Sequence, residues 1–281
     1  MSSSVQAGRV TKKKNTTRRR RVQHPKTQPQ DYEYDRNGSQ YNSHPLVERT
    51  NHLTIQEFTS KYISPEFLTY TTTSTSSSSS PEEEDKEQKY KLSIYDAATI
   101  PTTDLNACFN LIEETSSEAY RNSSTGWSPA KKKREMKLPD MKYLVVRRDI
   151  SSSSLSSSSS SRDDEAYGGE GAVVGFMSFM ITYEDGKEVV YLYEIHLSSG
   201  VQKQGLGKRL LLILMEIGRR VGMEKAMLTV FTSNGVAQRL YEAIGFDTDE
   251  YSPRPRRLRN GMVKEPDYRI MSVRLDGGPY V

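Results

Sequence analysis

The chain has 281 residues, 34% of them hydrophobic, and its formal net charge at pH 7 is +4. This hydrophobic fraction is low for a globular protein, and the deficit is local. Residues 1–45, 71–89 and 150–170 are rich in basic, serine, threonine, acidic or glycine residues. Such segments bury too little apolar surface to offset their chain entropy. We therefore expect them to be disordered and the remainder to form one domain.

The single cysteine, Cys108, excludes an internal disulfide framework and a cysteine-rich metal site. No apolar run approaches the length of a membrane span, so we expect no membrane association. Basic clusters at residues 12–14 and 18–21 fit a nuclear-import signal or contact with an acidic chromatin or ribosome surface, and a solvated tail is the alternative. We expect the protein in the nucleus and cytoplasm, with no direct reading of nucleic-acid sequence.

The first half of the chain alternates short predicted elements with low-complexity stretches. Ile55, Phe58 and Tyr62 lie at helical spacing and predict a short helix in an N-terminal extension over residues 46–70. The basic run at residues 131–134 is interpreted as the polar face of another short helix. Strands are predicted at 91–95 and 141–148, and a helix at 104–120 with Thr103 or Asp104 as its N-cap.

The second half predicts a sheet of mixed pairing. Residues 171–184 and 188–197 predict a hairpin around the Asp185-Gly186 turn. A helix at 206–220, a strand at 226–231, a helix at 234–244 closed by Gly245, and a strand at 268–275 are predicted next. This order predicts an α/β (α+β) domain over residues 90–276, with parallel pairing in its middle section.

The most distinctive motif is Q-K-Q-G-L-G-K at residues 202–208, between a predicted strand and a predicted helix. Gly205 and Gly207 allow the backbone to approach a ligand closely. A helix that begins there directs unpaired N–H groups and the positive end of its dipole at the ligand, which suits a pyrophosphate. A second block, N-x-x-A-x-x-L-Y-E-x-x-G-F, spans residues 234–246.

These two motifs, in this order and spacing, resemble the GNAT acetyltransferases. The resemblance implies the GNAT acyl-CoA N-acyltransferase fold, a central mixed sheet flanked by helices, with acetyl-CoA as cofactor and no metal. It further implies that the glycine loop cradles the pyrophosphate and that neighbouring strand ends contact the pantetheine arm. The cofactor-binding residues implied in this way are Ile195, His196, Leu197, Lys203, Gln204, Gly205, Leu206, Gly207, Lys208, Thr229 and Asn234.

Residues 191–197 (Y-L-Y-E-I-H-L), 201–208 and 227–231 further resemble the NatD type of N-terminal acetyltransferase, within a likeness over about residues 90–275. This implies acetylation of the free N-terminal amine of histone H4 and the A-type H2 histone, whose tails begin Ser-Gly-Arg-Gly. Two positions depart from the pattern: Thr125 stands where a tryptophan is common, and Thr182 where an acidic residue is expected. A GNAT enzyme acting on lysine or a small amine, or a non-catalytic acetyl-CoA sensor, are the alternatives.

Acetyl transfer to an amine needs a base, a stabilised oxyanion and a proton for the leaving thiolate. Glu194 is the predicted base, with ordering of the substrate as its alternative role, and Tyr241 is a candidate acid. Neighbouring residues of a regular strand face opposite sides, but the resemblance implies a bulge in this strand, which would bring Tyr193 into the site to position the substrate or transfer a proton. A lone histidine on a strand, such as His196, more often has a structural role than a catalytic one. The resemblance and the need to hold a cationic arginine imply these substrate-binding residues: Tyr120, Trp127, Glu184, Tyr193, Ser252 and Tyr268.

Overall fold

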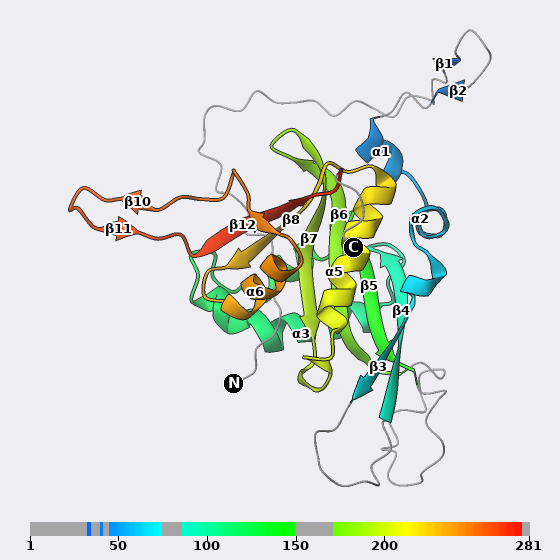
Figure 1. The fold of residues 1–281 in the computed structure, drawn as a ribbon. Helices are drawn as coiled ribbons and strands as arrows, with labels where there is room; N and C mark the ends of the chain where they lie inside the picture. The colour runs from blue at the N-terminus through cyan, green and yellow to red at the C-terminus, as the bar shows by residue number, and fades with distance from the viewer. Residues whose placement is uncertain (1–32, 35–39, 42–44, 75–85, 150–170, 277–281) are drawn as a thin grey trace.

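The computed structural model of the chain describes residues 33–34, 40–41, 45–74, 86–149 and 171–276. The expectations for the Ser-rich insert and for most of the basic tail lie outside these residues. The described residues form a domain around an eight-stranded sheet in the order β3-β4-β5-β6-β7-β8-β12-β9 (Figure 1). No helix in the described ranges combines the length and apolar character needed to cross a bilayer.

The pairing in the large sheet is antiparallel except between β7 and β8, which run parallel as predicted. Two short hairpins, β1–β2 and β10–β11, form separate two-stranded sheets. The strands of the large sheet are β3 (Thr69–Ser74), β4 (Lys86–Asp96), β5 (Lys142–Arg148), β6 (Val173–Glu184), β7 (Lys187–Leu197), β8 (Lys225–Phe231), β9 (Asp247–Thr248) and β12 (Tyr268–Arg274). The strands of the hairpins are β1 (Glu33–Tyr34), β2 (Gln40–Tyr41), β10 (Arg256–Arg257) and β11 (Val263–Lys264).

Helices cover both faces of the sheet and create two apolar clusters. One face is covered by α1 (Leu46–Asn51), α2 (Ile55–Tyr62), α5 (Leu206–Val221) and α6 (Gly235–Ala243). The other is covered by α3 (Thr102–Arg121) and α4 (Pro129–Glu135). The central strand β7 is buried on both sides, with Val190 and Leu192 in the first cluster and Val189 and Tyr191 in the second.

The β6–β7 hairpin turns at Asp185 and Gly186, as the sequence predicts. Their φ angles are +49° and +82°, and two positive values in succession match the twist of the flanking strands. Gly245 likewise has a φ of +97° and follows Ile244, the C-cap of α6, which confirms it as the residue that closes this helix.

The N-terminal extension packs on the sheet through α2. A capping box begins this helix, with Thr54 and Glu57 satisfying each other's backbone N–H groups. Ile55, Phe58 and Tyr62 are all buried, and the ring of Phe58 lies 6.4 Å from that of Phe179 on β6.

Three sequence predictions need correction here. First, β3 and β4 extend into residues 71–89, so the linker prediction is wrong for 71–74 and 86–89. Threonine reads as polar in composition, but its branched side chain suits a strand. Second, α3 begins at Thr102 with Pro101 as N-cap and no side-chain cap, not at Thr103 or Asp104; Asp104 instead forms a buried ion pair with Arg147. Third, the basic run 131–134 is not wholly a polar face, because Lys132 on α4 is buried.

Candidate active site

A β-bulge in β7 places two predicted catalytic residues on the same face of the sheet. Ser178 pairs with Glu194 and the next residue, Phe179, pairs with Leu192, so Tyr193 is the extra residue. Tyr193 belongs to the cluster under α3, and the Glu194 carboxylate contacts side chains from α3 and α4. The bulge that the resemblance implies is therefore present, and it has the expected effect on side-chain direction.

The parallel strands β7 and β8 separate just beside this bulge. Their pairing runs only from Val189↔Lys225 to Leu192↔Leu228, although β7 continues to Leu197 and β8 to Phe231. The second half of β7, which contains Glu194, therefore does not pair with β8 in the described structure. A split of this kind leaves the side of residues 193–197 that faces β8 without strand pairing.

The Glu194 carboxylate is the centre of a buried polar network. Its Oε1 accepts hydrogen bonds from the Lys132 ammonium at 2.6 Å and from the Tyr120 hydroxyl at 3.2 Å. Its Oε2 lies 2.7 Å from Nε2 of His196. Lys132 also donates to Tyr120 at 2.9 Å and to Glu135 at 3.2 Å. The side chains of Glu194 and Lys132 are 3% and 5% exposed, so this is a desolvated ion pair.

The charges in this network fix the protonation of its members. Burial alone raises the pKa of Glu194, but the Lys132 ammonium and the His196 ring outweigh it and hold that pKa below the usual value. Burial opposes the charged form of Lys132, yet the Glu194 carboxylate raises its pKa well above that of an ordinary lysine. For Tyr120, burial and the Glu194 charge both raise the pKa. Glu194 and Lys132 are therefore charged at neutral pH, and Tyr120 is a neutral phenol.

The ring of His196 belongs to this network rather than to the core alone. It is fully buried and stacks on Phe176 with 5.6 Å between ring centroids. Its Nδ1 lies 2.6 Å from the Thr115 hydroxyl, which itself donates to the carbonyl of Leu111. Held from both nitrogens, the ring fixes the orientation of the Glu194 carboxylate.

Aromatic side chains surround the network on the α3 side. Tyr120 packs against Trp127 at 5.5 Å and edge-on against Phe231 at 5.0 Å, between ring centroids. Tyr268, at the start of β12, is the cross-strand partner of Phe231. The predicted substrate residues Tyr120, Trp127 and Tyr268 thus lie around one region, and Trp127 and Tyr268 are only partly buried.

Two other predicted substrate residues, Ser252 and Glu184, are not part of the Glu194 network. Ser252 is buried, and its hydroxyl accepts a hydrogen bond from the backbone N–H of Ile270 at 3.1 Å. Glu184 lies at the far end of the β6–β7 hairpin, opposite Lys187. Glu194 lies seven positions along β7 from Lys187, about 23 Å of extended strand. The structure therefore does not bring Glu184 into the Glu194 network.

The glycine loop before α5 has the geometry of an anion site. Lys203 and Gly205 have φ angles of +62° and +80°. Gly205 is the N-cap of α5 and has no side chain to cap this end, and the first helical bond runs from Arg209 N–H to the Gly205 carbonyl. The N–H groups of residues 206–208 therefore have no partner within the helix, while Lys203 and Lys208 are exposed beside them.

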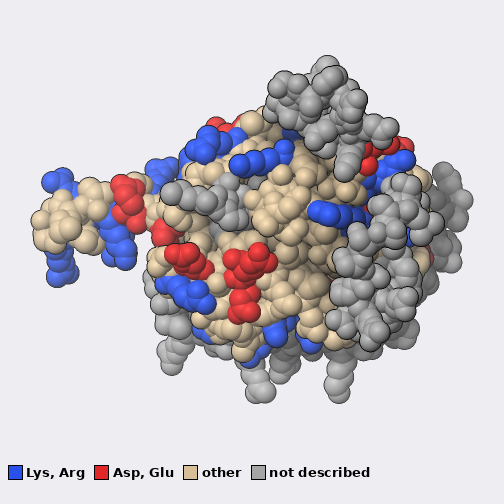
Figure 2. Space-filling view, turned by 90° about the horizontal axis from the view of Figure 1, so that it is seen from below, with Lys and Arg blue, Asp and Glu red and all other residues tan. Residues whose placement is uncertain are grey.

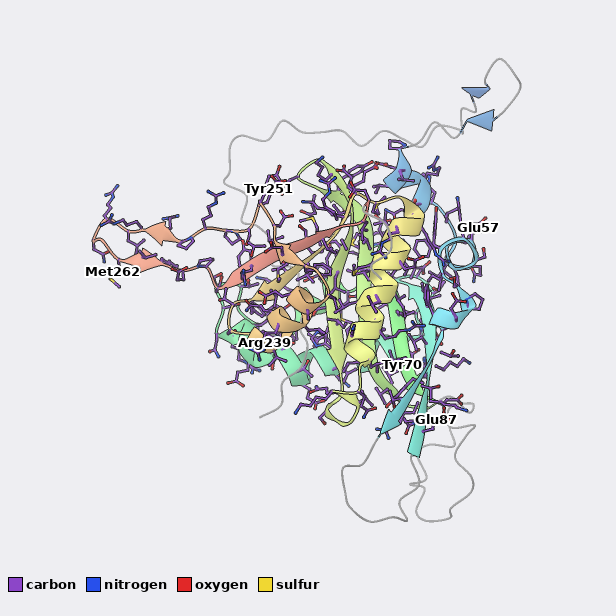
Figure 3. The ribbon with its side chains drawn as sticks, viewed as in Figure 1. Glu57, Tyr70, Glu87, Arg239, Tyr251 and Met262 are labelled. Atoms are coloured by element: carbon purple, nitrogen blue, oxygen red, sulfur yellow. The ribbon has the colours of Figure 1, made fainter. Side chains whose placement is uncertain are left out.

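Two tyrosines near the edge of the sheet form hydrogen bonds to this loop. The sequence did not predict these contacts. The Tyr70 hydroxyl on β3 donates to the carbonyl of Gln204 at 3.1 Å, and the Tyr90 hydroxyl on β4 donates to its side-chain oxygen at 2.8 Å. Gln204 in turn donates to the Gly200 carbonyl. A Cβ added to Gly205 would lie 2.7 Å from the Tyr70 oxygen, so a larger residue would displace this hydroxyl as well as strain the backbone. Figure 3 labels Tyr70 near the start of α5.

The remaining predicted cofactor residues lie around the split. Ile195 and Leu197 are buried on the α5 side of β7, and Leu206 and Gly207 are buried in the first turn of α5. The hydroxyl of Thr229 lies 2.5 Å from that of Tyr191, on the opposite face. Asn234 caps α6 by accepting from the Ala237 N–H at 3.1 Å. The side chains of Thr229 and Asn234 thus form hydrogen bonds within the protein, and their contact with a cofactor stays a prediction.

Tyr241 on α6 is fully buried, and burial followed by the Glu194 charge raises its pKa well above the usual value. Its hydroxyl is therefore protonated at neutral pH, as a proton donor requires. Among the described residues, no group of three His, Cys, Asp or Glu side chains could hold a metal ion.

The mixed sheet, its split parallel pair and the uncapped glycine loop together define the GNAT fold, whose enzymes use acetyl-CoA. Residues 135–246 match the family model described as "Acetyltransferase (GNAT) family". The matched region includes the bulge, the split and the glycine loop, and it is similar in sequence to that family. The residues present fit the cofactor, because the loop offers unpaired N–H groups where a pyrophosphate needs them.

A relative in Saccharomyces cerevisiae, N-alpha-acetyltransferase 40, is 31% identical over 176 residues. The alignment covers 54% of this chain and 54% of the relative, so the chain spans about half the length of the curated protein it matches. Solved structures are similar at lower identity. The ribosomal-protein-S18-alanine N-acetyltransferase of Escherichia coli is 19% identical, covering 67% of this chain and 96% of its own, with a TM-score of 0.39. The NatC complex bound to Gag peptide and CoA is 14% identical, covering 66% and 98%, with a TM-score of 0.43.

Proposed function

We propose that this protein is an N-alpha-acetyltransferase, which transfers the acetyl group of acetyl-CoA to the free N-terminal amine of a protein. The observation that carries the proposal is the ionised Glu194 carboxylate, held by Lys132 beside the split between β7 and β8. The name of the yeast relative supports the same activity.

The low pKa of Glu194 favours an N-terminal amine over a lysine side chain. An N-terminal amine has a pKa near 7.7–8.0, so about a third of it is already neutral at pH 7.5. A lysine amine has a pKa near 10.4, and only about one molecule in a thousand is neutral at that pH. A carboxylate whose pKa is held below the usual value is a weak base. It can orient a neutral amine and accept its proton as the bond forms, but it cannot hold a lysine neutral beforehand.

We infer the following roles for the other residues. Acetyl-CoA supplies the activated thioester when it is bound. Lys132 and His196 keep the Glu194 carboxylate charged and fixed in orientation. Tyr193, brought to the same face by the bulge, positions the amine, and the neutral hydroxyl of Tyr241 donates the proton that the leaving thiolate needs.

We infer that the substrates are the tails of histone H4 and the A-type H2 histone, which begin Ser-Gly-Arg-Gly. The partly exposed aromatic surface of Trp127 and Tyr268 supports this, since a guanidinium binds well over aromatic rings. The departures at Thr125 and Thr182 remove a ring and a carboxylate from the expected arginine site, so dependence on that arginine should be weak. A protein that acts on histones would work in the nucleus and also in the cytoplasm, where histones are newly made.

The test is acetylation of the peptide Ser-Gly-Arg-Gly-Lys-Gly by the full chain, compared with the same peptide blocked at its N-terminus. Label on the free peptide alone supports the proposal. Equal label on both would show lysine acetylation and overturn it. A third peptide that begins Met-Asp tests the histone assignment, because equal rates on both free peptides would reject that assignment while leaving N-terminal chemistry standing.

A further inference from the structure

A basic arm projects from the domain between β9 and β12. It comprises residues 254–264, with β10 and β11 as its two strands. Arg256 pairs with Lys264 and Arg257 with Val263, and the loop at the end closes through a hydrogen bond from Leu258 N–H to the Met262 carbonyl. Among the described residues the two strands pair only with each other, and the arm stands away from the sheet (Figures 1 and 3).

The charge of this arm has one sign. It carries four arginines and one lysine and no carboxylate. All five cationic side chains are exposed, and none of the four arginines forms an ion pair with a carboxylate among the described residues. Figure 2 shows Lys and Arg side chains on both sides of the arm, with carboxylates gathered nearer its base. The cationic residues are Arg254, Arg256, Arg257, Arg259 and Lys264.

The arm places like charges directly opposite each other. Arg256 and Lys264 are cross-strand partners, and such a pair destabilises a hairpin when no counter-charge lies between. An isolated two-stranded hairpin is at best marginally stable. The hairpin therefore gains stability when an anionic partner neutralises these charges.

The arrangement of the charges fits a groove lined by phosphates. Successive residues of a strand face opposite sides, so Arg256 and Arg257 present cations on both faces of the ribbon. A flat acidic protein surface would meet only one of these faces. A duplex groove places a phosphate strand on each side, and the major groove of B-form DNA admits a two-stranded ribbon. Met262 and Val263, 63% and 56% exposed near the tip, would then lie toward the floor of the groove.

We propose that the arm formed by residues 254–264 docks the protein on the phosphate backbones of a nucleic-acid duplex, without reading its sequence. Arginine suits this partner because its planar guanidinium binds phosphate oxygens in pairs. From Arg254 to Arg259 the arm extends about 15 Å, enough to place cations on both backbones of one groove.

The test is the binding of the full chain to a labelled 20-base-pair DNA duplex, measured by fluorescence anisotropy over a salt series. The Arg256→Gln/Arg257→Gln variant should bind at least about tenfold more weakly at 0.1 M salt. Its slope of log affinity against log salt should be smaller by about 1.8, because each phosphate that the protein neutralises contributes about 0.9 to the slope. The matched control is Arg219→Gln/Arg220→Gln on α5, which removes the same charge from arginines already paired with Glu216.

Equal weakening by the arm variant and the control would overturn the proposal, since net charge alone would then explain the binding. A 20-base-pair RNA duplex and polyglutamate are titrated in parallel. Arm-dependent binding of either duplex supports the proposal, and the duplex that binds more tightly shows whether the partner is DNA or RNA. Arm-dependent binding of polyglutamate with none of either duplex would overturn it in favour of an acidic protein partner. Equal melting temperatures of the variants show that the fold is intact.

Discussion

Replacing Lys132 by methionine tests the electrostatic account of the site. Methionine keeps most of the side-chain volume but removes the charge 2.6 Å from the Glu194 carboxylate. Removing one partner of a buried ion pair leaves the other charge desolvated, which typically costs about 3–5 kcal/mol. Glu194 is 2% exposed, so this range applies. We expect Lys132→Met to lower the free energy of unfolding at pH 7.5 by about 3–5 kcal/mol.

The sign of the pH dependence follows from the pKa of Glu194. In the wild-type protein that pKa lies below its unfolded value. The stability it contributes is therefore present above the unfolded pKa and is lost as the pH falls through the folded one. Without Lys132, burial becomes the main influence and raises the pKa of Glu194. The variant should then be least stable, relative to wild type, at pH 7–8, and the difference should shrink as the pH is lowered.

The assay is urea unfolding followed by fluorescence of Trp127, the single tryptophan, whose ring packs on Tyr120 beside the network. Lys131→Met on the exposed face of α4 is the control and should change stability by less than about 0.5 kcal/mol. The double variant Lys132→Met/Glu194→Gln should recover much of the loss, because no buried charge then lacks its partner. A loss below about 1 kcal/mol for Lys132→Met, constant from pH 5 to 8, would refute the reasoning.

Three further predictions concern catalysis, cofactor binding and packing. Glu194→Gln should lower kcat for the free peptide by about 10²–10⁴-fold while the melting temperature shows a folded protein; a wild-type rate would contradict the assigned role. Gly205→Ala forces an alanine into left-handed backbone against Tyr70, which costs about 1–2 kcal/mol. The KM for acetyl-CoA, measured by initial rates, should rise about tenfold, and an unchanged KM would show that the loop does not bind it. Phe58→Ala should lower the free energy of unfolding, measured in urea, by about 3–5 kcal/mol, and a loss smaller than about 1 kcal/mol would show that α2 is not part of the cooperative fold.

The sequence predicts the elements that depend on local patterns. The Asp185-Gly186 turn, the helix after Gly205 and the helix before Gly245 are found where they were expected, because glycine and turn residues determine backbone conformation locally. The bulge at Tyr193 was expected from the resemblance and not from spacing. Periodicity alone would place Tyr193 and Glu194 on opposite faces.

Lys132 was missed because a charge run indicates solvent exposure unless the packing of the helix is known. One local sequence signal was present: Lys132 lies four residues before the apolar Met136, which is the spacing of one helix face. Both side chains are buried, on α4 and at its C-cap. The role of Tyr70 could not be found in this way, because its contact with Gln204 joins residues 134 positions apart. Such a contact depends on the whole sheet and has no local sequence pattern.

The hydrogen bond from Tyr70 to the glycine loop connects the edge strand β3 to the proposed cofactor site. If acetyl-CoA binds more tightly when this loop is held, then a cofactor that orders the loop must also stabilise the pairing of β3 with β4, and by the same factor. The ends of β3 and β4 lead directly into residues 75–85. A modification or partner that acts on that segment and shifts the pairing of β3 would therefore change the affinity for acetyl-CoA from outside the site, and cofactor concentration would in turn change the affinity for that partner.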